Sequence, residues 1–210
     1  MSRPYLVYVV TDETVSGGRS HLQITERAVE GGADVVQLRA KGLEGRAMLN
    51  VAKDMRDATK GTDTLFIVND RLDIAILANA DGVHLGQDDI PVDEARRISP
   101  PGFIIGVSVG SVEESLRAEK EGADYIGLGP VFATTSKDDA GPVCGLDLLN
   151  SVKDSVGIPV VAIGGITMDN APSVIGAGAD GLAVISAVLV PEDIAAACLE
   201  LRKRVERSSE

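Results

Sequence analysis

The sequence has 210 residues, of which 44% are hydrophobic and 25% are charged, the balance of an ordinary soluble globular protein. Only 3% of the residues are aromatic and tryptophan is absent, so the core must be built from Val, Ile, Leu and Ala. The formal net charge of -12 argues against non-specific binding to nucleic acid, because the phosphates would be repelled. Any bound phosphate must therefore be held by a local arrangement of residues and not by the overall charge of the protein.

The cysteines and the apolar runs give no sign of export or membrane insertion. Cys144 and Cys198 are the only cysteines, too few for a disulfide framework and without the spacing of a zinc site. The run YLVYVV leads directly into TDET, and no run approaches the roughly 18 apolar residues of a membrane span. We therefore expect a cytoplasmic protein without a nucleic-acid or membrane partner. A homo-oligomer is compatible with this composition.

Short β-branched runs recur along the chain, and each is followed by a loop and a helix-like segment. We predict strands at Tyr5–Val10, Asp34–Leu38, Leu65–Val68, Gly82–Leu85, Phe103–Val107, Tyr125–Leu128, Val160–Ile163 and Gly181–Ile185. Several of these runs are apolar throughout, which is typical of parallel strands buried on both faces. Eight such units in 210 residues favour a compact (β/α)8 TIM barrel over an open doubly wound sheet. Because no linker divides the chain, we predict a single domain over residues 1–210.

A short echo in the sequence supports a repeated unit. The stretches GGADVVQL, ANADGVHL, EGADYIGL and GAGADGLAV each place Gly or Asn and then Ala-Asp before the second, fourth, sixth and eighth predicted strands. A Gly suits the left-handed end of a helix, and an Asp suits the turn into a strand. Helices that end in glycine are common in any α/β protein, so the echo alone does not decide the architecture.

In a TIM barrel the chemistry lies on the loops that leave the carboxyl ends of the strands. After the second strand, Arg39 and Lys41 are two residues apart, so on an extended segment they point the same way and could hold an oxyanion. Surface solvation, or an ion pair with a nearby acid, is the simpler alternative. After the sixth strand, Lys137 follows three hydroxyl residues, Thr134 to Ser136, in a loop that could cradle a phosphate.

Two glycines follow the seventh predicted strand in the stretch AIGGIT. Gly164 and Gly165 would let the backbone approach a ligand closely, and a helix predicted to start near Met168 would add its N-terminus. Many TIM barrels hold a phosphate after strands 7 and 8, where VIS ends at Ser186. A simple tight turn is the alternative.

Two neighbouring predicted strands end in acids and amides, in the stretches VND and GQDD. Each acid could cap the next helix, because Asp is a preferred N-cap and Pro91 suits a first helical turn. However, the two strands are adjacent in a barrel, so Asp70 and the acids at Asp88 and Asp89 would lie within reach of one small ion. Two carboxylates completed by diphosphate oxygens and water form a magnesium site.

Taken in order, these stretches resemble the thiamine phosphate synthase family of (β/α)8-barrel enzymes. The resemblance runs from YVVTD to VISAV and is carried by QLRAK, VNDR, GVHLGQDD, GVS, GADYIGLGPVFATTSK, AIGGIT and ADGLAVIS. Each stretch is a modest signal, whereas their order and spacing are highly specific. The resemblance implies an enzyme that joins 4-amino-2-methyl-5-(diphosphooxymethyl)pyrimidine to 4-methyl-5-(2-phosphoethyl)thiazole, giving thiamine phosphate and diphosphate.

The resemblance also implies roles for particular residues. The pyrimidine diphosphate would be bound by Gln37, Arg39, Lys41, Asn69, Ser108 and Lys137. The thiazole phosphate would be bound by Thr134, Thr135, Ser136, Gly165, Ile185 and Ser186. Mg2+ would be bound by Asp70 and Asp89, and the catalytic groups would be Arg39, Lys41, Ser108 and Lys137.

The family's route is dissociative: diphosphate leaves, a pyrimidine methylene cation forms, and the thiazole nitrogen captures it. Mg2+ and the cationic side chains would stabilise the departing oxygens, so no side chain need act as a nucleophile. We expect His84 to be a packed core residue rather than a catalyst. One departure from the family is visible, because ATTSK at 133–137 stands where Pro-Thr-X-Thr-Lys is usual. The length of the 131–145 loop would permit a lid.

Three alternatives remain at this point. A thiazole tautomerase of the same fold resembles the sequence along most of its length, but that group lacks the paired acids and carries a His where Gly129-Pro130 stand here. A Schiff-base aldolase would use Lys137 and need no metal. A non-catalytic sensor would bind thiazole phosphate without releasing diphosphate. The presence of both Asp70 and Asp89 favours the synthase.

Overall fold

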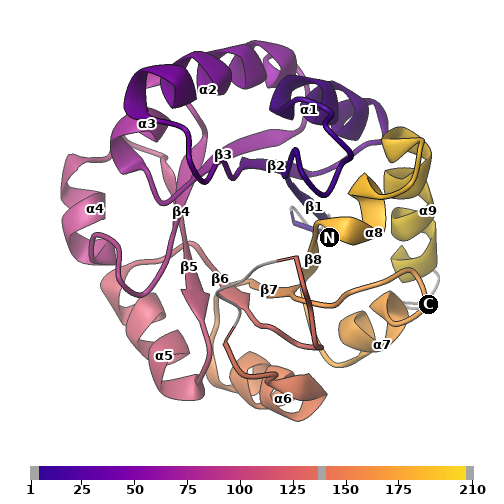
Figure 1. The fold of residues 1–210 in the computed structure, drawn as a ribbon. Helices are drawn as coiled ribbons and strands as arrows, with labels where there is room; N and C mark the ends of the chain where they lie inside the picture. The colour runs from indigo at the N-terminus through magenta and orange to yellow at the C-terminus, as the bar shows by residue number, and fades with distance from the viewer. Residues whose placement is uncertain (1–4, 137–140, 207–210) are drawn as a thin grey trace.

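The computed structural model describes residues 5–136 and 141–206. Figure 1 looks down a barrel of eight parallel strands that follow one another in sequence order, with helices around the outside. Pairing of the first strand with the last closes the ring. The predicted (β/α)8 TIM barrel is therefore confirmed. The strands are Val7–Val10 (β1), Val35–Leu38 (β2), Leu65–Asn69 (β3), Gly82–Leu85 (β4), Ile104–Val109 (β5), Tyr125–Leu128 (β6), Val160–Ile163 (β7) and Gly181–Val184 (β8).

Helices form the return connections of the barrel. In the described part of the chain, one helix follows each strand from β1 to β7, and two follow β8. They are His21–Glu30 (α1), Gly45–Thr59 (α2), Leu72–Leu77 (α3), Val92–Ile98 (α4), Val112–Glu121 (α5), Gly145–Ser155 (α6), Ala171–Gly176 (α7), Ser186–Leu189 (α8) and Ile194–Glu206 (α9). Because these helices cover the outer face of the sheet, most strand residues are buried on both sides, as the apolar runs predicted.

Three element ends differ from the prediction in ways that bear on function. β5 continues past Val107, so Ser108 lies within a strand rather than in a loop. β3 likewise includes Asn69. The helix after β7 begins at Ala171 and not near Met168, because residues 167–170 form a closed turn in which Asn170 Oδ1 accepts the N–H of residue 167 at 2.7 Å.

The Ala-Asp echo of the sequence is a fourfold structural repeat. The residue before each Ala-Asp pair has a positive φ, which is 70° at Gly32, 54° at Asn79, 95° at Gly122 and 99° at Gly178. In this left-handed conformation the chain leaves a helix and turns towards the next strand. The predicted left-handed helix ends are therefore confirmed. Asn takes the place of Gly once, since Asn tolerates this region better than most side chains.

The four aspartates of the echo clamp the neighbouring strands. Asp81, which precedes β4, accepts the backbone N–H of Phe66 in β3 at 2.8 Å and the Arg56 guanidinium of α2 at 2.8 Å. Asp124 and Asp180 make the same two bonds, one with the preceding odd-numbered strand and one with the helix before that strand. Asp34 bonds β1 in the same way, and its cation is Arg202 of α9, the last helix of the chain. The clamps lie where the strands begin, the end of a TIM barrel that serves stability rather than chemistry.

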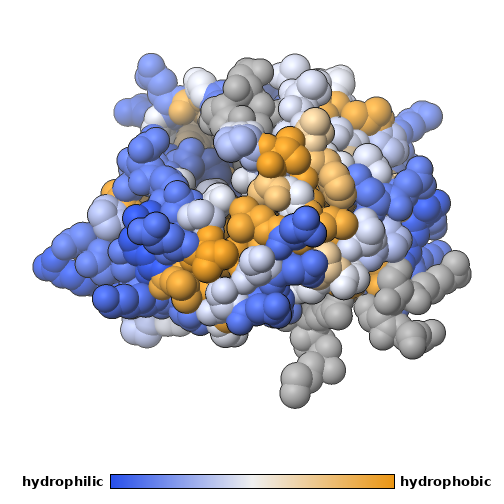
Figure 2. All heavy atoms as spheres, turned by 90° about the horizontal axis from the view of Figure 1, so that it is seen from below, coloured by the Kyte–Doolittle hydropathy of each residue, from blue (hydrophilic) through white to orange (hydrophobic). Residues whose placement is uncertain are grey.

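The outer surface mixes charged and apolar residues. Figure 2 shows the side of the barrel where α5 and α6 lie, and apolar residues form a broken strip there among charged ones. Other exposed apolar side chains lie on separate elements, such as Leu77 on α3 and Ile98 on α4. Scattered apolar side chains are usual on protein surfaces. Among the helices described, none is long and apolar enough to cross a membrane.

Candidate active site

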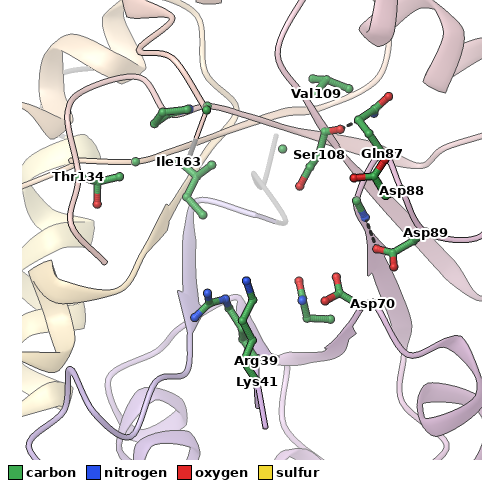
Figure 3. Close-up of a pocket in the computed structure, with 17 residues that line it drawn as sticks. Arg39, Lys41, Asp70, Gln87, Asp88, Asp89, Ser108, Val109, Thr134 and Ile163 are labelled. Atoms are coloured by element: carbon green, nitrogen blue, oxygen red, sulfur yellow. Dashed lines mark hydrogen bonds between the residues drawn. The ribbon is translucent and has the colours of Figure 1, made fainter. Parts of the chain in front are cut away.

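A cavity of about 460 Å³ opens at the carboxyl ends of the strands. Figure 3 shows Asp70, Asp88 and Asp89 along one side of it, with Thr134 and Ile163 on the opposite side. Many of the predicted site residues line this one space: Arg39, Lys41, Asn69, Asp70, Asp89, Ser108 and Thr134. Predicted site residues as far apart in the sequence as Arg39 and Thr134, 95 positions, therefore meet at one rim of the barrel.

The two predicted metal-binding acids come from adjacent strands and face the same cavity. Asp70 follows β3 directly, and its backbone N–H donates to the His84 carbonyl of β4 at 2.8 Å. Asp89 closes the turn after β4, because its Oδ2 accepts the N–H of Gly86 at 2.6 Å. The prediction that these acids converge agrees with this arrangement.

Neither acid is a helix cap, so the alternative reading of their position is wrong. The N-cap of α3 is Arg71, and that of α4 is Pro91. Neither helix start receives a side-chain capping bond. The proline thus precedes its helix instead of occupying the first helical position.

Arg39 and Lys41 line the same cavity as the acids, and Figure 3 shows both side chains extending into it. The Arg39 side chain is only 8% exposed, and its guanidinium lies 3.2 Å from the Asp12 carboxylate. Asp12 is fixed in turn, because its other carboxylate oxygen accepts the N–H of Val15 at 3.0 Å. Arg39 therefore forms an ion pair and lines the cavity at the same time, and the pair restrains its guanidinium at the cavity wall.

A smaller cavity of about 30 Å³ adjoins the first and shares Thr134, Ile163 and Gly164 with it. It contains most of the residues predicted to hold the thiazole phosphate: Thr134, Ser136, Gly165, Ile185 and Ser186. Thr135 is exposed and lines neither cavity. Lys137 lies outside the described residues, so its catalytic role and the lid stay predictions.

The glycines of AIGGIT are required for a reason that the sequence did not reveal. Gly164 and Gly165 have φ values of 98° and 64°, which side chains rarely adopt. In addition, a Cβ on Gly165 would lie 2.5 Å from the carbonyl oxygen of Ala133. The glycines therefore admit the loop after β6, which carries Thr134 and Ser136, and do not only leave room for a ligand.

A buried polar chain forms the floor of the site, and the sequence reasoning missed it. Gln37 Nε2 donates to the Tyr8 hydroxyl at 2.7 Å, which lies 2.8 Å from the Tyr125 hydroxyl. That hydroxyl lies 2.9 Å from His84 Nδ1, and His84 Nε2 lies 2.9 Å from Ser108 Oγ. Burial raises the pKa of both tyrosines, so the hydroxyls keep their protons. His84 is buried as predicted, yet it also contacts a predicted site residue.

The donor set on the acidic side suits a small divalent cation. Carboxylates and amide oxygens are the hard ligands that Mg2+ prefers, and Asp89 keeps one carboxylate oxygen outside its turn bond. Within the described residues, no three His, Cys, Asp or Glu side chains form a complete metal cage. Mg2+ is usually held by one or two carboxylates together with substrate phosphates and water, so the arrangement fits.

A family model described as thiamine monophosphate synthase matches residues 7–188. The chain belongs to this family. Within the family, a thiamine-phosphate synthase from Methanocella arvoryzae is 59% identical over 198 residues, which cover 94% of this chain and 93% of that protein. One from Methanoculleus marisnigri is 59% identical over 201 residues, covering 96% and 95%. The solved thiamine phosphate pyrophosphorylase from Pyrococcus furiosus is 45% identical, with a TM-score of 0.90 and coverage of 99% and 98%.

Membership in the thiamine monophosphate synthase family fixes the class of activity. The chain is a transferase of thiamine biosynthesis and acts on small molecules. The predicted synthase is thus confirmed over the tautomerase, the aldolase and the sensor. More distant structures, such as a 3-hexulose-6-phosphate synthase that is 19% identical with a TM-score of 0.68, share the fold alone.

Proposed function

We propose that this synthase condenses 4-amino-2-methyl-5-(diphosphooxymethyl)pyrimidine with 4-methyl-5-(2-phosphoethyl)thiazole and uses Mg2+ to do so. The products are thiamine phosphate and diphosphate. The observation that carries the proposal is the placement of acids and cations around one cavity. Asp70 and Asp89 supply metal ligands there, while Arg39 and Lys41 supply positive charge. A diphosphate bound to a divalent ion has the charge pattern that both groups would recognise.

The leaving group would be held by the cationic side chains. When bound by Asp70 and Asp89, Mg2+ supplies charge neutralisation at the diphosphate oxygens. Arg39 offers a planar fork to those oxygens, and Lys41 offers a mobile point charge. Because Asp12 fixes Arg39, little reorganisation is needed as negative charge builds on the departing group. Lys137 would add a third cation from the loop after β6.

The pyrimidine would lie over the floor of the cavity. Gln37, Asn69 and Ser108 offer amide and hydroxyl groups of the kind that an aminopyrimidine can pair with. Ser108, Gly127 and Ile163 border both the main cavity and a small space among the strands, where Gln37 lies. The ring would therefore meet polar groups at its edge and apolar side chains on its face.

The phosphate group of the thiazole substrate would lie at the mouth of the smaller cavity, and the thiazole ring would extend into the main cavity. The phosphate would be held by hydroxyls of Thr134, Ser136 and Ser186 and by the backbone of Gly165 and Ile185, with Thr135 exposed at the rim. Since the two cavities share Thr134 and Ile163, the two rings would lie next to each other. Loss of diphosphate would leave a pyrimidine methylene cation, and the thiazole nitrogen held beside it would capture that cation.

A direct experiment mixes the purified protein with both substrates and Mg2+. We expect thiamine phosphate and diphosphate to appear in equal amounts, and neither to appear when one substrate is left out. Asp70→Asn and Asp89→Asn should remove product formation. Asp73→Asn and Asp93→Asn, which alter neighbouring acids outside the cavity, serve as matched controls and should retain it. Equal turnover by the two pairs of variants would contradict the metal assignment.

Two earlier expectations stay predictions. A cytoplasmic location would be tested by fractionating the source cells and assaying each fraction for the protein. A homo-oligomer would be tested by sedimentation of the purified chain, which has a mass of 21.9 kDa.

A further inference from the structure

The polar chain beneath the cavity joins five different strands into one hydrogen-bonded path. In order, its members are Gln37 on β2, Tyr8 on β1, Tyr125 on β6, His84 on β4 and Ser108 on β5. Tyr8 and Tyr125 are 1% and 0% exposed, so bulk water does not compete for these bonds. Only the last member, Ser108, borders the main cavity. The chain therefore connects the buried centre of the barrel to Ser108, the member of the path that faces the main cavity.

The two ends of the path give it a direction. The Gln37 Nε2 group only donates, so the Tyr8 oxygen accepts there and the Tyr8 proton goes to Tyr125, its other partner among the described residues. The Tyr125 proton then goes to Nδ1 of His84. With Nδ1 as acceptor, the neutral imidazole carries its proton on Nε2 and donates to Ser108 Oγ. The opposite direction would leave the Tyr8 proton without an acceptor in the described part of the chain, which is costly in a buried site.

Two glycines keep the space that this path needs. Gly106 lies between His84 and Tyr125 in the sheet, and a Cβ there would come within 2.1 Å of the Tyr125 ring. Gly127 pairs with Ser108, and a Cβ there would lie 2.9 Å from Cε1 of His84. Either side chain would displace a member of the path. Glycine at these two positions therefore leaves the space that the Tyr125 and His84 rings occupy.

We propose that His84, acting through the path from Gln37, is a positioning residue that fixes the Ser108 hydroxyl as a hydrogen-bond donor to the bound pyrimidine diphosphate. Because Oγ accepts the proton of His84 Nε2, the Ser108 proton is directed at an acceptor atom of the ligand, either a ring nitrogen or a phosphate oxygen. Without the path, the hydroxyl rotates among several partners and must be ordered when the ligand binds. This inference rests on the proposed contact of Ser108 with that substrate.

A double-mutant cycle separates this role from simple packing. We expect Ser108→Ala to lower kcat/KM for the pyrimidine diphosphate by about tenfold and Tyr125→Phe by about fivefold, each equivalent to one hydrogen bond. In the Ser108→Ala background, Tyr125→Phe should change kcat/KM less than about twofold, because its effect acts through the missing hydroxyl. The matched control is Tyr5→Phe, since Tyr5 stacks on Tyr125 at 4.9 Å but contributes no bond to the path.

The protonation pattern can be read without any activity assay. His21 and His84 are the only histidines in the sequence, so nitrogen NMR of the labelled protein contains two imidazoles, and His21→Gln assigns them. We expect His84 to show the Nε2–H tautomer in the wild type. Tyr125→Phe should shift the Nδ1 resonance of His84, whereas Tyr5→Phe should leave that resonance unchanged.

Each outcome has a distinct meaning. The Nε2–H tautomer together with a non-additive cycle supports the proposal. A His84 ring with its proton on Nδ1, or an additive cycle, overturns it while leaving the proposed substrates intact. An unchanged kcat/KM for Ser108→Ala overturns both the proposed Ser108 contact and this inference, and absence of thiamine phosphate from the wild-type mixture would overturn the proposed reaction itself.

Discussion

Asp70 holds a backbone conformation that side chains rarely adopt, which makes its replacement informative. Its φ is 62°, in the left-handed region. We predict that Asp70→Gly is more stable than Asp70→Ala, although Gly is usually the less stable of the two. We also predict that both variants lose turnover. The two substitutions remove the same carboxylate and the same side-chain contacts, so the difference between their stabilities reports the backbone alone.

The size of the difference follows from two opposing terms. A residue with a Cβ costs about 1–2 kcal/mol in the left-handed region relative to glycine. Against this, the greater freedom of glycine in the unfolded chain costs about 0.4–1 kcal/mol. The balance leaves Asp70→Gly roughly 0.5–1 kcal/mol more stable than Asp70→Ala. For a chain of this size, that corresponds to a Tm higher by roughly 1–4 °C.

Thermal unfolding and Mg2+-dependent product formation measure the two effects on the same samples. Asp73 provides the control because it lies within the first turn of α3. There the order should reverse, with Asp73→Ala more stable than Asp73→Gly by about 1 kcal/mol, and turnover should persist. A higher Tm for Asp70→Ala than for Asp70→Gly would refute the backbone argument. Wild-type turnover in either Asp70 variant would refute the role of its carboxylate.

Three further predictions concern the barrel. Asp81→Ala removes the acceptor of the Arg56 guanidinium and of a strand N–H, so we expect a loss of about 2–3 kcal/mol in urea unfolding. Gly106→Ala places a Cβ 2.1 Å from Tyr125 and should cost about 1–3 kcal/mol in the same assay through overpacking. Burial lowers the pKa of His21, so the imidazole binds a proton more readily in the unfolded chain than in the folded one. The free energy of unfolding should therefore fall as the pH drops below about 6.5. His21→Gln should reduce that slope. Unchanged urea midpoints, or a slope that His21→Gln leaves intact, would contradict these expectations.

The barrel was predictable because parallel strands covered on both faces appear in the sequence as short apolar runs. The ends of those runs were less certain, since polar residues at the rim still belong to the sheet. Asn69 and Ser108 are both strand residues, although each looked like the start of a loop. The helix after β7 began later than predicted because the Asn170 side chain closes a turn that the helical pattern did not reveal.

The main cavity was also predictable, because all parallel strands of a barrel end at one rim. Polar residues after successive strands, such as Asp70 and Asp89, must therefore gather there. Contacts across the interior were not predictable from one sequence. Tyr8 and Tyr125 are 117 positions apart, and the sequence around each tyrosine does not indicate that the two hydroxyls form a hydrogen bond. A usable signal was the presence of Tyr and His at buried positions of otherwise apolar strands.

We propose that Asp70, which follows β3, and Asp89, in the turn after β4, bind one divalent ion together with a diphosphate. Mn2+ can replace Mg2+ as a paramagnetic probe, so electron paramagnetic resonance of the protein with Mn2+ and diphosphate tests the claim directly. We predict one bound Mn2+ per chain in the wild type and in Asp73→Asn, and none at the same concentrations in Asp70→Asn or Asp89→Asn. Undiminished Mn2+ binding in both Asp70→Asn and Asp89→Asn would contradict the account.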